Sequence, residues 1–207
     1  MLEHVAKRSV RASAHEGADA GIALGGIRKR ALDIVIAGIA LILLAPILFA
    51  TAILIRLLIG RFVLAASERV GFGGKAFTCY QFRSAVSNSN DTNSAIFCLN
   101  DHSWAEGLAC ALRGSGLDKL PLLFGVLRGD MSLIGPRPIK VGELLRYCGP
   151  MPEYFTARPG ITGLWRQSGT PNRRSLANQI ALDRYYIRSW SMRLDLALLI
   201  KAVSAVA

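Results

Sequence analysis

The feature that most constrains the fold is an uncharged run of 22 residues, 34–55, which reads IVIAGIALILLAPILFATAILI. A helix needs about 20 mostly apolar residues to cross a bilayer, and this run exceeds that length. Few domains in a chain of 207 residues could bury such a helix. A cleaved signal peptide is disfavoured, because a long tail precedes the run and apolar residues continue past the small residues at 50–52. We therefore expect residues 34–55 to enter a membrane.

Pro46 lies near the middle of this run. Proline removes one helical hydrogen bond and clashes with the carbonyl one turn earlier, so we expect a kink there. Basic residues flank the run on both sides: Arg28, Lys29 and Arg30 before it, Arg56 and Arg61 after it. Positive residues favour the cytoplasmic side of a membrane. A re-entrant helix that bends at Pro46 and returns to the same leaflet satisfies both flanks better than a full span.

The charge of the chain restricts its partners. Twenty-five Lys and Arg against fourteen Asp and Glu give a net charge of +11, which indicates nucleic acid, anionic lipid or a phosphorylated substrate. A hydrophobic content of 52% favours membrane lipid as a partner, and with the apolar run it argues against nucleic acid. The four cysteines lack the close spacing of a zinc site, and we expect free thiols.

Three parts are expected along the chain: a mobile tail at 1–26, the membrane segment at 27–60, and a cytoplasmic domain at 61–207. The glycines at 71, 73 and 74 separate β-prone segments and predict a β-hairpin over 68–82. Apolar and aromatic residues at spacings of three and four predict one helix over 182–203, lying in the head-group zone. Packing of that helix on the domain is the alternative. The expected class is α+β, mostly helical, with a re-entrant helix, a small hairpin and amphipathic helices around a compact domain.

Residues 112–138, LRGSGLDKLPLLFGVLRGDMSLIGPRP, concentrate charge among turn-forming residues. Four cations in or beside this stretch could together receive a multiply charged anion such as a diphosphate: Arg113, Lys119, Arg128 and Arg137. Asp118 is a poor phosphate ligand but a possible nucleophile or metal ligand. By charge alone, a solvated basic segment explains the pattern equally well.

Short motifs spread over residues 27–205 connect the chain to one enzyme family. They are KRALD at 29–33, RVG at 69–71, GKAF at 74–77, FRS at 82–84, LD at 117–118, LP at 120–121, GDMSLIGPRP at 129–138, RPGITGLW at 158–165, and Tyr186, Trp190 and Asp195. This set resembles the bacterial sugar transferase family, the monotopic polyprenyl-phosphate phosphoglycosyl transferases. The small exopolysaccharide priming enzymes look most similar.

The resemblance implies an activity, a place and a cofactor. Such enzymes transfer a phosphosugar from a UDP-sugar to undecaprenyl (polyprenyl) phosphate, the first membrane step of surface polysaccharide biosynthesis. They work at the cytoplasmic face of the bacterial inner membrane, where downstream glycosyltransferases are possible partners. The family uses an aspartate that forms a covalent phosphosugar intermediate, together with Mg²⁺. Asp118 matches that nucleophile, and we expect it also to be a metal ligand.

Seven further residues are expected to bind substrate: Arg83, Arg113, Arg128, Asp130, Arg137, Pro138 and Arg158. Pro136 and Pro138 flank Arg137 and fix a rigid turn that would aim its guanidinium at a phosphate. A purely structural turn is equally consistent with that pattern. Asp130 is expected either to face the substrate or to hold Arg128 or Arg137 in place.

The chain departs from the family pattern at the residue after the nucleophile. The family has an Asp-Glu pair, whereas this chain has Asp118-Lys119, so we place Lys119 with Asp118 in the catalytic pair. A cation here is expected to weaken Mg²⁺ binding. Either Lys119 replaces part of the metal charge and activity survives, or the chain is an impaired paralogue with a regulatory or scaffolding role. Other departures include Gly116 for a usual serine and Arg166 for a usual glutamine.

Overall fold

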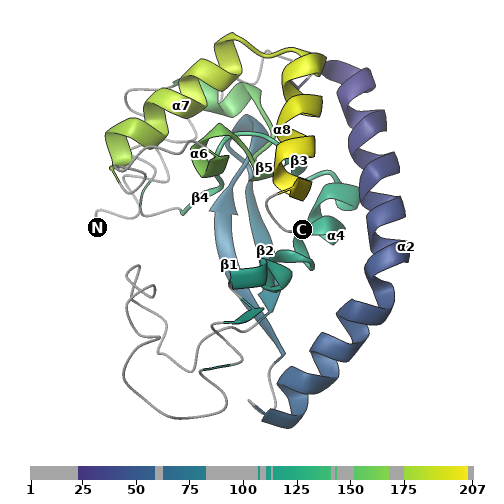
Figure 1. Ribbon diagram of the computed structural model, residues 1–207. Helices are drawn as coiled ribbons and strands as arrows, with labels where there is room; N and C mark the ends of the chain where they lie inside the picture. The colour runs from purple at the N-terminus through teal and green to yellow at the C-terminus, as the bar shows by residue number, and fades with distance from the viewer. Residues whose placement is uncertain are drawn as a thin grey trace.

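One long helix runs along the side of a compact group of short strands and helices (Figure 1). The computed structural model describes residues 23–58, 63–82, 107, 111–112, 114–140, 143, 152–167 and 175–204. Most of the expected tail lies outside these residues, as do Arg61, Arg83 and Arg113. The mixed, mostly helical class with a small sheet and a long apolar helix is confirmed.

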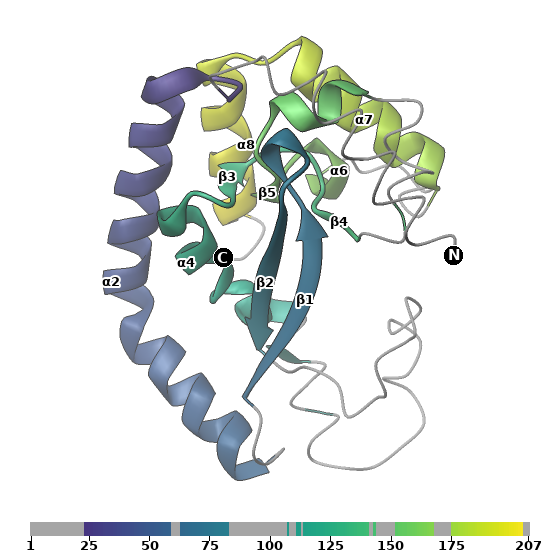
Figure 2. The same cartoon turned by 180° about the vertical axis from the view of Figure 1, so that it is seen from behind.

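The long helix is α2, Gly26–Leu58, which continues through Pro46 for 33 residues. Figures 1 and 2 show it curving around one side of the molecule. Its mean hydropathy reaches 2.7, and only 11% of its most apolar 18-residue window is buried. Ile42, Leu43 and Phe49 are 70% or more exposed. The core helix of a soluble protein would be mostly buried, so this helix has the length and surface of one that enters a membrane.

The predicted hairpin is confirmed. Strands β1, Leu64–Val70, and β2, Ala76–Phe82, pair antiparallel from Leu64↔Phe82 to Val70↔Ala76. The turn between them contains the short helix η1, Phe72–Gly74, where Gly73 takes a left-handed φ of 63° that favours glycine. A third strand, β4 (Ile139–Lys140), pairs antiparallel with β1 and completes the sheet order β2-β1-β4.

A second, two-stranded sheet pairs β3, Ser132–Ile134, in parallel with β5, Gly160–Thr162. Two glycines permit this close approach of the GPRP and RPG motifs. A Cβ on Gly135 would lie 2.5 Å from the Arg158 carbonyl oxygen, and a Cβ on Gly160 would lie 2.2 Å from the Gly135 nitrogen. Any larger residue would push the two segments apart.

Short helices fill the remaining positions. They are η3 Leu117–Lys119, α4 Leu122–Arg128, η5 Pro152–Thr156 and α6 Leu164–Gln167, followed by α7 Leu176–Arg188 and α8 Met192–Ser204. The single helix expected over 182–203 is therefore wrong. The chain breaks because the Ser189 N–H closes α7 on the Tyr185 carbonyl, and Ser191 caps α8 by accepting from the Leu194 N–H at 3.2 Å.

Two hydrophobic clusters hold α2 to the domain. The main core contains the fully buried Met131, Ile139, Tyr154 and Phe155, and Ala37 of α2 packs in it. A smaller cluster joins Ile55, near the end of α2, to Phe82 and Leu112. Both halves of the long helix therefore contact the same domain.

Candidate functional site

Asp118 lies on the single turn η3, which begins after a residue in a left-handed conformation. Gly116 has a φ of 74°, and its carbonyl accepts from the Lys119 N–H at 3.1 Å. A side chain at Gly116 would be strained in this conformation, which favours glycine at this position. Leu117 packs against the cluster of Ile55, Phe82 and Leu112, so this turn is positioned beside the second half of α2.

The Asp118 carboxylate is buried, and the described residues place no hydrogen-bond donor on its Oδ1. The residue is 6% exposed, and its Oδ1 accepts no hydrogen bond in the described part of the chain. The Lys119 Nζ lies 3.5 Å from that oxygen and forms an ion pair with it. Buried carboxylate oxygens are usually hydrogen-bonded. Asp118 Oδ1 departs from that pattern, as expected of a carboxylate that attacks an electrophile such as phosphorus.

Arg166 on α6 is a cation that lies beside this turn. It was not among the site residues predicted from the sequence. Its Nη2 lies 3.9 Å from the position that a Cβ on Gly116 would take. The sequence marked Arg166 only as a departure after Trp165, because nothing in the spacing showed that α6 would meet the turn before Asp118. The structure therefore pairs Asp118 with Lys119 and places Arg166 beside Gly116, two residues before Asp118.

Other predicted cations have structural partners. The Arg158 Nε donates to the Gly129 carbonyl at 3.0 Å, and its guanidinium lies 5.5 Å from the centre of the Phe72 ring. Burial lowers the pKa of Arg158 below its ordinary value. The Arg137 Nη1 donates to Gln179 Oε1 at 2.5 Å, and its Nη2 lies 3.7 Å from Glu143 Oε2. These contacts favour the structural explanation of both residues, and their substrate contacts stay predictions.

The remaining expected residues lie near α4 and β4. Arg128 is exposed at the end of α4 and borders a small hollow with Thr78 and Tyr80 of β2. Pro138 contributes its carbonyl oxygen, which accepts from Arg69 Nη1 at 3.0 Å. In the described residues, Asp130 makes no ion pair with either arginine proposed as its partner.

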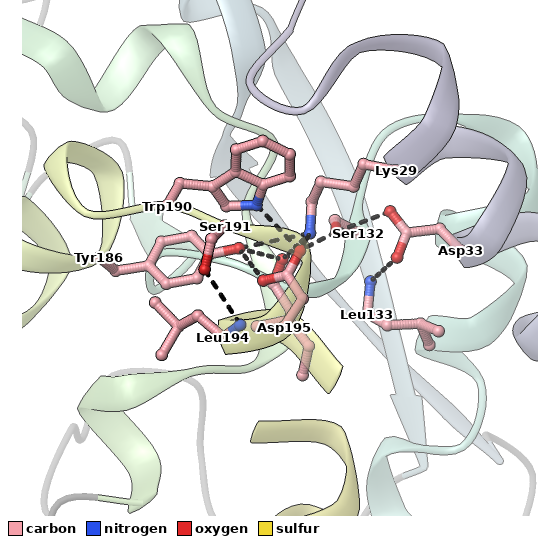
Figure 3. A network of polar contacts seen from close by, with 10 residues as sticks. Lys29, Asp33, Ser132, Leu133, Tyr186, Trp190, Ser191, Leu194 and Asp195 are labelled. Atoms are coloured by element: carbon pink, nitrogen blue, oxygen red, sulfur yellow. Dashed lines mark hydrogen bonds and ion pairs between the residues drawn. The ribbon is translucent and has the colours of Figure 1, made fainter. Parts of the chain in front are cut away.

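A buried polar network joins the start of α2 to α8 (Figure 3). The Lys29 ammonium donates to Asp195 Oδ2 at 2.5 Å and to the Ile134 carbonyl at 3.0 Å. The Tyr186 hydroxyl donates to Asp195 Oδ1 at 2.6 Å, and Trp190 Nε1 donates to Oδ2 at 2.9 Å. Burial, together with the Asp195 charge, raises the pKa of Tyr186, which therefore stays a neutral donor. The motif residues Tyr186, Trp190 and Asp195 therefore attach the first turn of α2 to the domain.

Two other charged residues of the KRALD motif, Arg30 and Asp33, also bind α2 to the domain. The Arg30 guanidinium donates to the Val126 and Leu127 carbonyls at 2.6 and 3.0 Å, which caps the end of α4. Asp33 accepts from Ser132 Oγ at 2.7 Å and from the Leu133 N–H at 3.2 Å. Lys29 and Arg30 are thus bound to the domain rather than extended into lipid head groups.

The described residues offer a poor site for the Mg²⁺ implied by the family resemblance. No group of three His, Cys, Asp or Glu side chains gathers anywhere in the described ranges. Asp118 would be a lone carboxylate ligand, and the Lys119 ammonium already lies 3.5 Å from its Oδ1. Mg²⁺ binds oxygen ligands at about 2.0–2.1 Å, so the metal and the ammonium would compete for the same side of one carboxylate.

Comparison with known proteins completes this picture. The family model described as bacterial sugar transferase matches residues 24–207. The chain belongs to the bacterial sugar transferase family. This match confirms the family assignment made from the motifs. Several of the motif residues form the buried attachment of α2 described above.

Three relatives illustrate the family. The exopolysaccharide production protein ExoY of Sinorhizobium fredii is 34% identical over 88% of this chain and 87% of its own length. The UDP-glucose:undecaprenyl-phosphate glucose-1-phosphate transferase of Caulobacter vibrioides is 34% identical over 87% of this chain and 70% of its own length. The undecaprenyl-phosphate galactose phosphotransferase of Salmonella typhimurium is 39% identical over 67% of this chain and 32% of its own length.

Proposed function

We propose that this sugar transferase moves a phosphosugar from a UDP-sugar to undecaprenyl phosphate in the synthesis of an exopolysaccharide. Relatives named as undecaprenyl-phosphate glucose and galactose phosphotransferases support the substrates, and ExoY supports the pathway. The observation that carries the proposal is the buried Asp118 carboxylate, whose Oδ1 accepts no hydrogen bond from the described residues and lies 3.5 Å from the Lys119 ammonium.

The reaction has two displacements at one phosphorus atom. A carboxylate oxygen of Asp118 attacks the sugar-linked phosphorus, and the bond from that phosphorus to the bridging oxygen breaks. UMP leaves with the bonding electron pair, and the phosphosugar remains on Asp118. An oxygen of the polyprenyl phosphate then attacks the same phosphorus, and the bond to Asp118 breaks. The products are the lipid diphosphate sugar and the restored carboxylate.

The contacts of α2 support insertion from one side of the membrane. Lys29 and Ile55 both contact the domain, and along a helix they are separated by about 39 Å. The hydrocarbon core of a bilayer is about 30 Å thick. A straight span would carry the contacts of Ile55 with Phe82 and Leu112 to the face opposite Lys29. We therefore propose a re-entrant α2, bent near Pro46, with the domain on the cytoplasmic face.

The ion pair between Lys119 and Asp118 also favours a second candidate function, that of a catalytically impaired paralogue. A carboxylate paired with an ammonium at 3.5 Å is a weaker nucleophile, as an impaired regulatory or scaffolding paralogue would have. The active transferase would release UMP from a UDP-sugar, whereas the impaired paralogue would not.

The test is an assay in nanodiscs with undecaprenyl phosphate and a panel of UDP-sugars. We expect UMP release from the wild type, and an intact mass increased by one phosphosugar when the lipid is omitted. Asp118→Asn should abolish the adduct and lower UMP release by at least about 10³-fold, as nucleophile loss does in other enzymes. The exposed strand residue Glu68→Gln is the matched control and should retain activity. Absence of UMP release from the wild type with every sugar, with gain on Lys119→Glu, would establish the impaired paralogue instead.

A further inference from the structure

We propose that Lys119 and Arg166 together supply the positive charge for transfer at Asp118, so that this enzyme turns over without a divalent cation. The inference rests on the proposed function. It follows from the disagreement between the described residues and a Mg²⁺ site, and from two cations that the fold brings to one turn.

Lys119 lies where an incoming phosphate would meet it. Its Nζ is 3.5 Å from Asp118 Oδ1, and its side chain is 26% exposed against 8% for the Asp118 side chain. The lysine side chain is therefore more accessible to solvent than the carboxylate, and a diphosphate that reaches Asp118 Oδ1 comes close to the ammonium. An ammonium in this position attracts the phosphate and offsets its repulsion by the carboxylate.

Arg166 brings a second cation from a distant part of the chain. The parallel pair β3–β5 leads into α6, and Arg166 on that helix approaches Gly116 to 3.9 Å from the hypothetical Cβ. No ion pair joins Arg166 to an acid in the described part of the chain. Guanidinium groups bind phosphate oxygens through two parallel hydrogen bonds, which suits an arginine in this place.

The charges of the three side chains sum to one net positive unit, without a metal. Phosphoryl transfer depends on cations placed against the non-bridging oxygens of the phosphate, and ammonium or guanidinium groups can take that place. Lys119 and Arg166 form and break no covalent bond here. The bonds that form and break are those of the two displacements of the proposed reaction.

The experiment follows UMP release and the phosphosugar adduct in EDTA and in Mg²⁺. For the wild type we expect a difference below about threefold between the two conditions, because the side chains already carry the required charge. Lys119→Met should lose about 10²-fold in EDTA, whereas Lys119→Arg should retain most activity. Lys119→Glu should require Mg²⁺, and Arg166→Gln should lose about tenfold or more in EDTA. The exposed Lys75→Gln, on the hairpin turn, is the control and should match the wild type.

A second readout measures metal affinity without turnover. Binding of Mn²⁺, followed by electron paramagnetic resonance without nucleotide, should be weak in the wild type and stronger in Lys119→Glu. Wild-type activity that disappears in EDTA and returns with Mg²⁺ would overturn the inference and leave the proposed function intact. Tight Mn²⁺ binding by the wild type that Asp118→Asn removes would also overturn it. Absence of UMP and adduct under every condition would overturn both proposals.

Discussion

The Lys29 ammonium lies 2.5 Å from Asp195 Oδ2 and joins the first turn of the long apolar helix α2 to α8. Both side chains are less than 10% exposed, and Tyr186 and Trp190 complete the carboxylate's partners. The Asp118 turn and this attachment lie at different ends of α2. The position of Asp118 relative to α2 therefore depends on contacts at both ends of that helix.

Removal of either partner should strongly destabilise the protein. Lys29→Met or Asp195→Asn leaves a buried polar group without its counter-charge, which costs about 3–5 kcal/mol. The double variant should cost less than the sum of the single variants, because it leaves no unpaired charge. Denaturant unfolding in detergent measures this cycle. Additive effects would show that the two residues do not interact energetically.

Gly116→Ala should destabilise the turn that carries Asp118. The φ of 74° is left-handed, and alanine there costs about 1–2 kcal/mol. We expect a lower Tm together with a lower kcat. Gly114→Ala is the matched control, because a Cβ there meets nothing within 4 Å and its φ is not left-handed. Equal effects of the two substitutions would contradict the conformational explanation.

The ion pair between Glu153 and Arg188 should contribute to stability in a pH-dependent way. The Arg188 hydrogen bond lowers the pKa of Glu153 below its ordinary 4.5 in the folded state. The contribution is therefore full above pH 4.5 and is lost as the pH falls through the lowered folded pKa. The pair is exposed, so Glu153→Gln should cost at most about 1 kcal/mol at pH 7. The Tm difference from the wild type should disappear in acid, and a difference that grows in acid would contradict this sign.

Cys79 should resist alkylation in the folded protein. Burial raises the pKa of its thiol to about 11, so about one molecule in a thousand carries the reactive thiolate at pH 8. Peptide mass spectrometry after iodoacetamide treatment should find Cys79 unmodified until denaturant is added. Rapid labelling of Cys79 in the native protein would show that this strand opens readily.

Both ends of α2 should react with a membrane-impermeant maleimide from the cytoplasmic side. Ile27 and Leu57 are 82% and 76% exposed, so single cysteines at these positions in a cysteine-free background should be tolerated. Val35→Cys, within the apolar run, should stay unlabelled until detergent is added. Labels on opposite faces would replace the re-entrant helix with a spanning one.

The sequence predicted those parts of the fold that depend on local patterns. The long apolar helix and the glycine turn of the hairpin follow from neighbouring residues. The break at Ser189–Ser191 was missed because the aromatic and apolar spacing continues across it, while two serine caps end one helix and start the next.

Long-range partners account for the other differences. Lys29 and Arg30 have the position of membrane-flanking charges, and their true partners lie 166 and about 96 positions away. Arg166 has no local signal for its place beside Gly116, because the pairing of β3 with β5 positions α6. Charge alone could not separate Arg137 and Arg158, which have structural partners, from the cations around Asp118.

The distance along the chain between Lys29 and Asp195 also sets an order of events during synthesis. At 5–20 residues per second, the 166 positions between them take roughly 10–30 s to translate. For most of that interval α2 has been translated, while Asp195, which binds its first turn, has not. The lipid contacts proposed for α2 would therefore form before its ion pair with Asp195. Any truncation before α8 would leave that final step undone.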